Sequence, residues 1–564
     1  MRKIIIALCA LAALWVGAPA QAKTQAPKSP LVDVAIPMFP AAGPSVKPPG
    51  FEVTAGQAVQ AAKTSPKMQA IHRLHHPLQF RVFVLIRSHY EVYFFFHGKI
   101  IGDVLVWRDG RRGPTYTGPL TVAFYGRGHY GDIFDSPFVF LPFGLLFLLP
   151  LARLRRSSGT TWLDRLDLGM LLSFGVSYAV FDAKHLEAGV WLAYPPLLYL
   201  LIRLLRRGWR GRSGNGRLEC RLPIGLLAVG LLALTAARIG LTLAPSHVMD
   251  VGGASAIGAY RILHGQSIYF ASLGHPDTYG PIAYLAYLPF QLIWHDASWY
   301  SYLPSVRATT IAFDLVTIGG LVLLGARLRP GREGRRLGLV LGWLWAACPF
   351  SLLGMVKGTN DGLVAMFVVL LMLSLSSPMR RGVVLGLAAA AKFFPAILLP
   401  LLAARGPDGS LRESRKALAG FVIAAGASVA LFLPSGGLKE VYDHTIGYQL
   451  TRSDVFSPWA LHPGLAPLKL AIELGVIVLA LTLAVRPRGA RTPAQVSALA
   501  GALIIGVQLP ALHWFYLYIV WFLPLVLIAV LGEGDPVPES LVIDVEPLEL
   551  PGTVPATDSV VATA

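Results

Sequence analysis

The stretch GVVLGLAAAAKFFPAILLPLL, residues 382–402, decides the fold of this chain. It is as long and as apolar as a membrane span, for which roughly 20 residues suffice. Pro395 cannot continue an α-helical hydrogen-bond ladder, so the helix must break there. Lys392 lies between the two apolar halves, and an ionisable residue inside a membrane is costly unless it has a function. The stretch therefore predicts a broken or re-entrant pair of helices with a functional lysine at the break.

The rest of the chain has the same apolar character. Of its 564 residues, 54% are hydrophobic and 14% are charged, and the mean hydropathy is +0.57. Globular domains have roughly 25% charged residues. The formal net charge of +18 comes largely from arginine clusters in short loops beside apolar runs, which is the pattern of the positive-inside rule. This composition predicts an all-α polytopic membrane protein, surrounded by membrane lipids, and excludes nucleic acid as a partner.

Apolar runs and arginine clusters alternate along the chain and predict about twelve to fourteen spans. When the spans are counted in order, every basic cluster falls on one side, which we expect to be cytoplasmic. Two long segments are then extracytoplasmic loops, Ala244 to about Tyr300 and Ser435 to about Pro463. The predicted spans are 138–151, 168–181, 190–205, 223–243, 303–326, 337–355, 363–375, the broken stretch within 383–403, 418–433, 466–485, 494–509 and 514–531.

The N-terminal part is predicted to be extracytoplasmic. Residues 1–22 combine two basic residues, an apolar run and a small-residue site, as in a cleavable secretory signal peptide. Residues 51–136 show a capped helix after Thr54 and then strand-like runs at 80–86, 92–96 and 100–107, which predicts a small α+β module. Its first 70 residues or so resemble a PepSY-like module. The remaining divisions are a flexible linker at 23–50, three additional transmembrane helices at 137–220, a transmembrane core at 221–531 and a disordered cytoplasmic tail at 532–564.

Neither the cysteines nor the histidines indicate a metal centre. Cys9 lies in the signal peptide, and Cys220 and Cys348 lie at or within helices, so no disulfide framework or Cys-based metal site is expected. We interpret the cluster His72, His75, His76 as a solvated basic turn. No cofactor is expected to be required; a divalent metal is compatible with the chain, but no ligand cluster indicates one.

The sequence predicts that the chemistry takes place on the extracytoplasmic side. The cytoplasmic loops are short and basic and contain no phosphate-binding loop. The two long loops outside carry Asp, His, Tyr, Arg and Asn. Because soluble nucleotides are made inside the cell, the energy for a synthesis outside must arrive with the substrate, as it does with a lipid phosphate sugar.

Four motifs, in order, resemble those of the GT-C glycosyltransferases, closest to the bacterial polyprenyl-phosphate-mannose-dependent mannosyltransferases of glycosyltransferase family 87. The first begins at Asp250, just beyond an outward-going helix, and ends at Tyr279-Gly280-Pro281, one proline short of the family's pattern. The second is Gly354 to Asp361, which departs from the family by Lys357 and Asp361. The third is GLAAAAKFFP at 386–395, and the fourth is LHWFY at 512–516. The resemblance covers about residues 221–531 and implies a GT-C-like helical bundle.

This resemblance implies transfer of a sugar, first of all mannose, from a polyprenyl phosphate donor to an extracytoplasmic lipid or cell-envelope glycan, with inversion. The acceptor hydroxyl must lose a proton, and a carboxylate in a partly desolvated cleft can take it. Asp250 is the candidate base and Asp277 the substitute. Lys392 and Lys357 are candidates for the leaving phosphate. Further candidate phosphate or sugar contacts are Asn360, Asp361, Tyr260, Tyr279, His513 and Arg452, together with His444, Tyr269 and Trp459.

Two other functions remain open at this point. The break at Pro395 with its buried Lys392 also suits a multi-span transporter or a flippase for lipid-linked sugars. Transporters usually repeat their span pattern, and we find no such repeat. A membrane sensor or assembly protein, whose active part is the outer module, is the third hypothesis.

Overall fold

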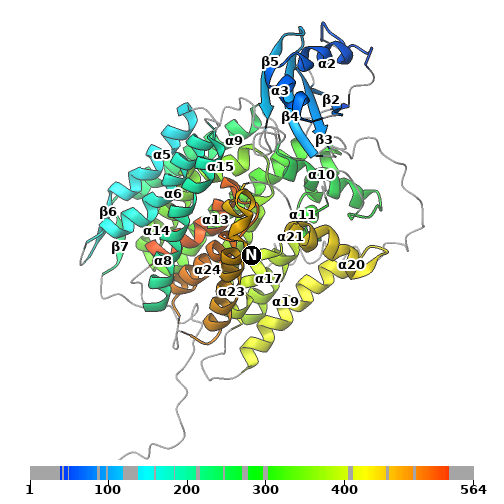
Figure 1. Ribbon diagram of the computed structural model, residues 1–564. Coiled ribbons are helices and arrows are strands. Elements are labelled where there is room, and N and C mark those ends of the chain that lie inside the picture. The colour runs from blue at the N-terminus through cyan, green and yellow to red at the C-terminus, as the bar shows by residue number, and fades with distance from the viewer. Residues whose placement is uncertain are drawn as a thin grey trace, which may run out of the picture.

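The computed structural model is mostly helical, with a small sheet-containing module at one edge (Figure 1). The structure describes residues 39–40, 44–48, 50–75, 77–85, 89–96, 99–117, 137–157, 160–182, 185–210, 216–244, 248–269, 277–295, 303–403, 411–451, 456–486 and 491–532. The predicted signal peptide, much of the predicted linker and nearly all of the predicted tail lie outside these ranges and stay predictions.

The module is an antiparallel sheet of order β1-β2-β3-β4-β5 with two short helices on one face. Helix α2 begins with a capping box, in which Thr54 and the side chain of Gln57 each accept the other's backbone N–H. The predicted helix and three strands are confirmed. Strand β5 was not predicted, because Gly113 and Pro114 weaken a strand pattern. The bounds are β1 Phe39–Pro40, α2 Ala55–Lys63, α3 Pro66–Leu74, β2 Gln79–Leu85, β3 His89–Phe96, β4 Lys99–Trp107 and β5 Arg112–Thr117.

The two faces of this sheet differ in chemistry. One face packs apolar side chains against α2 and α3. The other face buries the polar side chains of His89, Glu91, Tyr93 and Asp103, each at most 3% exposed. Glu91 accepts a hydrogen bond from the Tyr93 hydroxyl (2.8 Å) and lies 3.3 Å from His89 Nε2. Neither carboxylate oxygen of Asp103 has a hydrogen-bond partner among the described residues. Burial, and then the nearby Glu91 carboxylate, raise the pKa of Asp103 well above its ordinary value.

The stability of the module is expected to fall as the pH rises, because of Asp103. Between the ordinary carboxyl pKa and the raised one, the folded protein binds more protons than the unfolded chain. The loss is about 1.4 kcal/mol for each pH unit in that window. Asp103→Asn cannot ionise, so this variant should be more stable than the wild type near neutral pH and lose that dependence. Hydrogen exchange of the β3 and β4 amides in the full-length protein, corrected for intrinsic rates at each pH, measures the effect; equal pH profiles in both proteins would contradict it.

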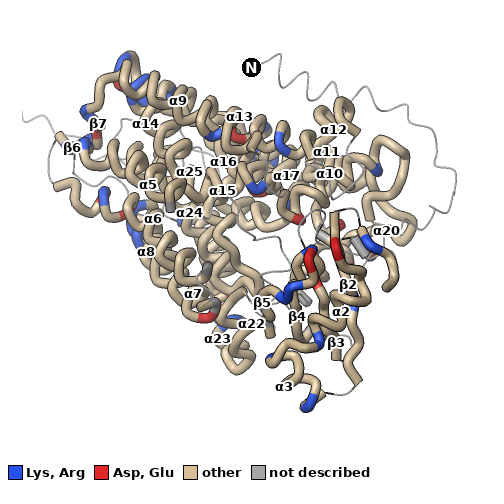
Figure 2. Tube along the Cα trace, turned by 90° about the horizontal axis from the view of Figure 1, so that it is seen from above, with Lys and Arg blue, Asp and Glu red and all other residues tan. Residues whose placement is uncertain are grey.

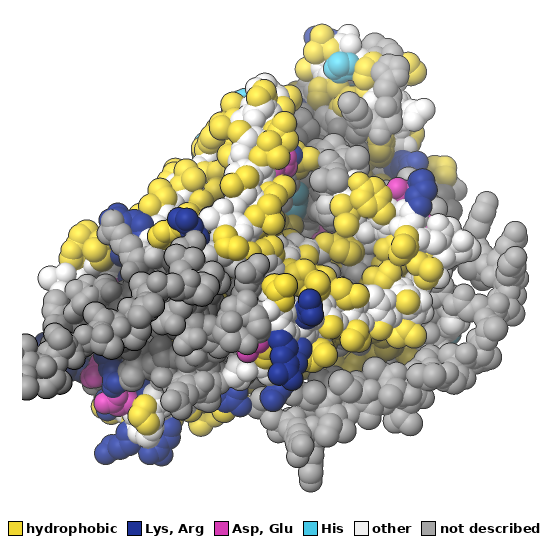
Figure 3. Space-filling model, turned by 90° about the horizontal axis from the view of Figure 1, so that it is seen from below, with side chains coloured by type: hydrophobic (Ala, Val, Ile, Leu, Met, Phe, Trp, Pro, Cys, Tyr) yellow, Lys and Arg dark blue, Asp and Glu magenta, His cyan; other side chains and the backbone are white. Residues whose placement is uncertain are grey.

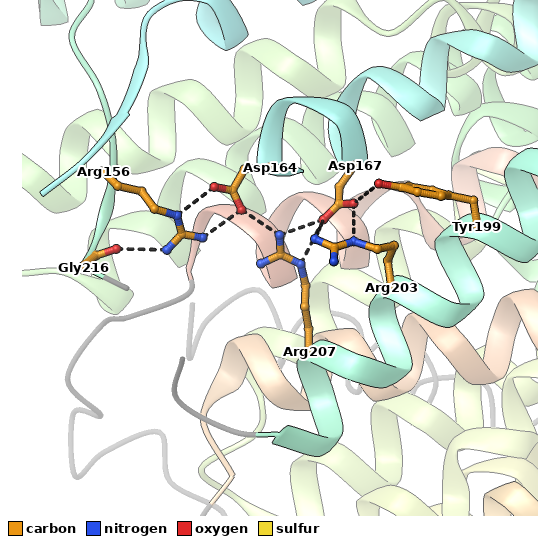
Figure 4. Close-up of polar contacts among 7 residues, drawn as sticks. All are labelled: Arg156, Asp164, Asp167, Tyr199, Arg203, Arg207 and Gly216. Atoms are coloured by element: carbon orange, nitrogen blue, oxygen red, sulfur yellow. Dashed lines mark hydrogen bonds and ion pairs between the residues drawn. The ribbon is translucent and has the colours of Figure 1, made fainter. Parts of the chain in front are cut away.

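Three helical stretches follow the module where three additional spans were predicted, and a chain of ion pairs joins β6, α6 and α8 (Figure 4). Asp167 of α6 accepts hydrogen bonds from Tyr199, Arg203 and Arg207 of α8 at 2.7–3.1 Å. Arg207 also reaches Asp164, which pairs with Arg156. The elements are α5 Pro137–Ala152, β6 Leu154–Arg156, α6 Trp162–Asp182, α7 Leu186–Leu192, α8 Tyr194–Arg210 and β7 Leu218–Cys220, and β6 pairs with β7.

Asp167→Leu is expected to destabilise the protein by about 3–5 kcal/mol, because two arginines lose their shared carboxylate while largely buried. The control is Glu473→Leu, which breaks the more exposed i,i+4 pair Lys469–Glu473 and should cost no more than about 1 kcal/mol. Thermal unfolding of the two variants in detergent compares the effects. Equal shifts in both variants would contradict a stabilising role for the network.

The basic segments lie together at one end of the helical part. Arg329 donates hydrogen bonds to the carbonyls of Leu218 and Leu531 (3.1 and 2.8 Å), and Arg217 pairs with Glu333 (3.1 Å). Figure 2 shows Lys and Arg gathered around β6 and β7. These contacts bring the basic cluster at 327–336 together with residues 217–218 and with the end of α25 at Leu531, whereas the predicted membrane topology stays a prediction.

The remaining helices form the bundle. Helix α14 and α15 meet at a bend of 61°, at Pro349, and α17 gives way to a 3₁₀ turn and a short helix beyond Lys392, which confirms the predicted break. The bounds are α9 Ile224–Leu243, α13 Pro304–Leu328, α14 Gly331–Ala347, α15 Pro349–Val356, α16 Asp361–Leu373, α17 Pro378–Ala391, η2 Phe394–Leu398, α18 Leu399–Leu402, α19 Arg412–Ala430, α23 Ala466–Leu483, α24 Pro493–Gln508, η5 Tyr516–Tyr518 and α25 Ile519–Leu531.

The outer surface of several helices is apolar, as a bilayer requires. Large hydrophobic side chains are exposed along α9, α19 and α23, and Figure 3 shows hydrophobic side chains over much of one face. Among the described residues, four helices are long and apolar enough to cross a membrane, or up to five if the bent pair is one span, and four shorter apolar helices accompany them. The chain is thus a multi-pass membrane protein, and the number of twelve to fourteen spans stays a prediction.

Both long segments that were predicted as loops contain helices. The first holds α10 Asp250–Leu263, so the candidate base is the first residue of a helix and not a loop residue, which corrects the sequence-based expectation. The small residues from Gly252 to Ala256 have no amphipathic pattern that would predict a helix. They allow α10 to pack closely against its neighbours. The other elements are α11 Pro281–Leu285, α12 Leu288–Trp294, α20 Gly437–Tyr442, the π-helical η3 Asp443–Gly447, α21 Tyr448–Thr451, α22 Pro458–Leu461 and η4 Pro463–Leu465.

Candidate functional site

A buried ion pair lies at the helix break. Beyond Ala391 the backbone becomes extended at Lys392, and Lys392 Nζ lies 2.5 Å from Asp361 Oδ1. The same ammonium is 5.4 Å from the ring centroid of Tyr279 and 5.1 Å from that of Trp521. The lysine side chain is 11% exposed and the aspartate side chain 1%. A carboxylate and two ring faces together stabilise an ammonium that has left water.

Trp521, from the last helix α25, completes this cluster and was not predicted. Its indole N–H donates to Asp361 Oδ1 (2.9 Å). Its ring stacks between Phe394 and Tyr518, with centroid distances of 3.9 and 4.1 Å. A tryptophan in an apolar helix is normally interpreted as an anchor at the membrane interface. The sequence therefore gave no sign that Trp521 belongs to the site.

The turn before α16 holds the N-terminal end of α10. Gly358 has a φ of +65°, and a Cβ on Gly252 would lie 1.8 Å from the Gly358 carbonyl oxygen, so only glycine permits this approach. The Lys357 carbonyl accepts the N–H of Met249 (2.8 Å), and the Lys357 side chain is buried. Asn360 Nδ2 donates to Ser255 Oγ (3.1 Å). The second motif and the start of the first are therefore in direct contact.

Asp250 is the first residue of α10, and its carboxylate forms no ion pair with the described residues. Its Oδ1 accepts the adjacent N–H of Val251 (2.8 Å), and no ion pair to it occurs among the described residues. The residue is neither fully buried nor fully exposed. Asp361 and Asp277 differ, because each faces a basic side chain. Of the three carboxylates, Asp250 is therefore the one without an ion pair among the described residues, and it stays the candidate base.

Asp277 pairs with His444, from the second predicted loop. The two atoms, Asp277 Oδ2 and His444 Nδ1, are 2.6 Å apart, and the aspartate side chain is fully buried while the histidine is 16% exposed. Tyr279 follows two residues later and is tied to the helix break, where the Gly280 N–H donates to the Ala391 carbonyl (3.2 Å). The substitute base, Asp277, is therefore in contact with the imidazole of His444. Through Tyr279 and Gly280, the pair is connected to the helix break at Lys392.

Two of the predicted residues, Tyr260 and His513, lie away from the Lys392–Asp361 pair. Tyr260 is near the other end of α10, about 15 Å along the helix from Asp250, and stacks on His264. His513 contacts Phe456 and Tyr518, whose ring leads to Trp521. Arg452 lies outside the described residues. Among the described residues, no group of three His, Cys, Asp or Glu side chains is placed to hold a metal ion.

The candidate site thus contains the carboxylate of Asp250, the buried ammonium of Lys392 at the helix break, and the aromatic rings beside that ammonium. Such a set can take a proton, bind an anion and hold a sugar ring. Comparison with known proteins agrees with this chemistry: the family model of glycosyltransferase family 87 matches residues 278–512. No curated protein and no solved structure matches the chain.

Proposed function

We propose that the chain is a GT-C-like glycosyltransferase that transfers a sugar, first of all mannose, from a polyprenyl phosphate donor to a lipid or cell-envelope glycan acceptor. The match of residues 278–512 to the model of glycosyltransferase family 87 supports this proposal. The site then faces the extracytoplasmic side of the cell membrane, opposite the end where the arginine clusters gather, and the C-terminal tail is cytoplasmic.

The observation that carries this proposal is the contact between four motifs that are far apart in the sequence. The turn at Lys357–Asn360 contacts the start of α10 on either side of Asp250, at Met249 and Ser255. Asp361 pairs with Lys392, and Tyr279 faces the same ammonium. The fourth motif reaches them through Tyr518 and Trp521. If these motifs served only to pack separate helices, their residues would not be expected to meet at one charged cluster.

The proposed chemistry follows from the groups present. The acceptor hydroxyl gives its proton to Asp250, and its oxygen attacks the anomeric carbon as the bond from that carbon to the phosphate oxygen breaks. The polyprenyl phosphate leaves with the bonding electrons, and Lys392 lies near its negative charge. A single displacement inverts the anomeric configuration and needs no covalent enzyme intermediate.

The test is transfer of radiolabel from polyprenyl phosphate mannose, and then from polyprenyl phosphate arabinose, to membrane lipids and glycans by the purified protein in proteoliposomes. Enzyme-dependent label in a product from either donor supports the proposal. Folded protein that transfers from neither donor, but moves labelled donor across the bilayer, would instead support the transporter or flippase hypothesis, which the broken helix at Lys392 also suits.

A further inference from the structure

The pair Asp277–His444 is a second polar site beside the proposed donor site. His444 lies in the π-helical turn η3, an uncommon backbone form that often marks functional positions. The turn packs onto the first long segment, where Val441 shares a small apolar cluster with Ile262, Tyr269 and Tyr284. The two long segments of the chain are therefore joined at this point.

The ion pair fixes which nitrogen of the imidazole is free. Asp277 Oδ2 lies 2.6 Å from Nδ1, although the contact does not have the geometry of a hydrogen bond. For a neutral imidazole, the carboxylate favours the tautomer with the proton on Nδ1, which leaves the lone pair on Nε2. Among the described residues Nε2 has no hydrogen-bond partner, and unlike Nδ1 it is not shut off from solvent. In that tautomer, the accessible Nε2 can accept a hydrogen bond from a hydroxyl group.

The surroundings of His444 suit a sugar. The Tyr269 ring lies 6.0 Å from the imidazole, tilted against it, and the Tyr269 hydroxyl donates to the Tyr279 carbonyl (3.3 Å). Burial raises the pKa of Tyr269, so its hydroxyl stays neutral. The Tyr279 ring in turn faces Lys392. His444 is thus linked through Tyr269 and Tyr279 to the cation assigned to the phosphate.

We propose that His444, oriented by Asp277, accepts a hydrogen bond through Nε2 from a hydroxyl group of the sugar bound at this site. His444 then contacts the substrate, and Asp277 is a positioning residue that acts through the imidazole. This inference rests on the proposed function, and the hydroxyl belongs either to the transferred sugar or to the acceptor.

Two conservative variants separate this role from a purely structural one. The side-chain amide of asparagine can replace Nδ1 opposite Asp277 but does not extend to the position of Nε2, whereas the amide of glutamine reaches that position. If Nε2 binds a hydroxyl, His444→Gln retains more activity than His444→Asn, and His444→Asn raises KM about tenfold, the effect of one hydrogen bond. Asp277→Asn should lower activity less than His444→Asn.

Kinetics with polyprenyl phosphate mannose as the varied substrate, and then with the membrane acceptor fraction varied, assign the hydroxyl to the donor or to the acceptor by which KM rises. The matched control is the exposed pair His462–Glu187, at 3.2 Å, where His462→Asn should change neither KM nor kcat. A His444→Asn variant that is folded and as active as the wild type, or more active than His444→Gln, overturns the proposal. An inactive wild type would instead refute the proposed function.

Discussion

Replacing Asp250 by asparagine is expected to lower the rate of sugar transfer by roughly 10²–10⁴-fold, the usual contribution of a general base. The substitution keeps the shape of the side chain and its contact with the Val251 N–H, so the fold and the donor KM should change little. The reason for choosing Asp250 is structural: Asp277 and Asp361 face His444 and Lys392, whereas the carboxylate of Asp250 faces no basic group among the described residues.

The measurement is the initial rate of transfer from polyprenyl phosphate mannose in proteoliposomes, with equal amounts of folded protein. The control is Asp109→Asn, a module carboxylate paired with Arg111 at a turn, which should keep wild-type activity. Full activity of Asp250→Asn would remove Asp250 as the base and return the assignment to the remaining candidates.

Replacing Lys392 by methionine is expected to abolish transfer and also to destabilise the protein by about 3–5 kcal/mol. The destabilisation has a clear cause, because Asp361 stays buried with the Trp521 N–H as a hydrogen-bond donor but without its cation. The double variant Lys392→Met, Asp361→Leu removes both charges and should recover much of the stability, since a buried pair replaced by apolar residues is often neutral.

Activity separates the structural role of this ion pair from the proposed contact with the phosphate. If Lys392 binds the leaving phosphate, the double variant stays inactive although it is folded. Thermal unfolding in detergent and the transfer assay, run on both single variants and the double variant, complete the cycle. Lys469→Met, in a more exposed pair, serves as the control for loss of a lysine. A stable and active double variant would show that Lys392 only compensates Asp361.

Much of the architecture follows from the sequence because its causes are local. Apolar runs require lipid, and Pro395 disfavours a continuous helix through this stretch, where α17 ends at Ala391. Arg329, from one of the predicted basic clusters, donates hydrogen bonds to the carbonyls of Leu218 and Leu531, so three distant segments meet at one end. The capping box at Thr54 and Gln57 is equally local, and α2 begins where it predicts.

Other elements were missed because their signal is weak in a single segment. Helix α10 was taken as a loop, since the small residues after Asp250 carry no periodic apolar stripe. Strand β5 was missed because Gly113 and Pro114 disfavour strands, and the pairing with β4 outweighs them. In both cases tertiary packing outweighed local preference.

The sequence by itself determined that this chain is a membrane protein with a charged break at Lys392, and that Asp250, Asp277, Lys357 and Asp361 belong to the motifs around it. Only the tertiary structure decided which of these groups meet. It paired Asp361 with Lys392 and Trp521, and Asp277 with His444, and it left Asp250 without a basic partner among the described residues. The reason is physical: a pairing between residues on distant helices depends on how those helices pack, and no local pattern in the chain encodes that geometry.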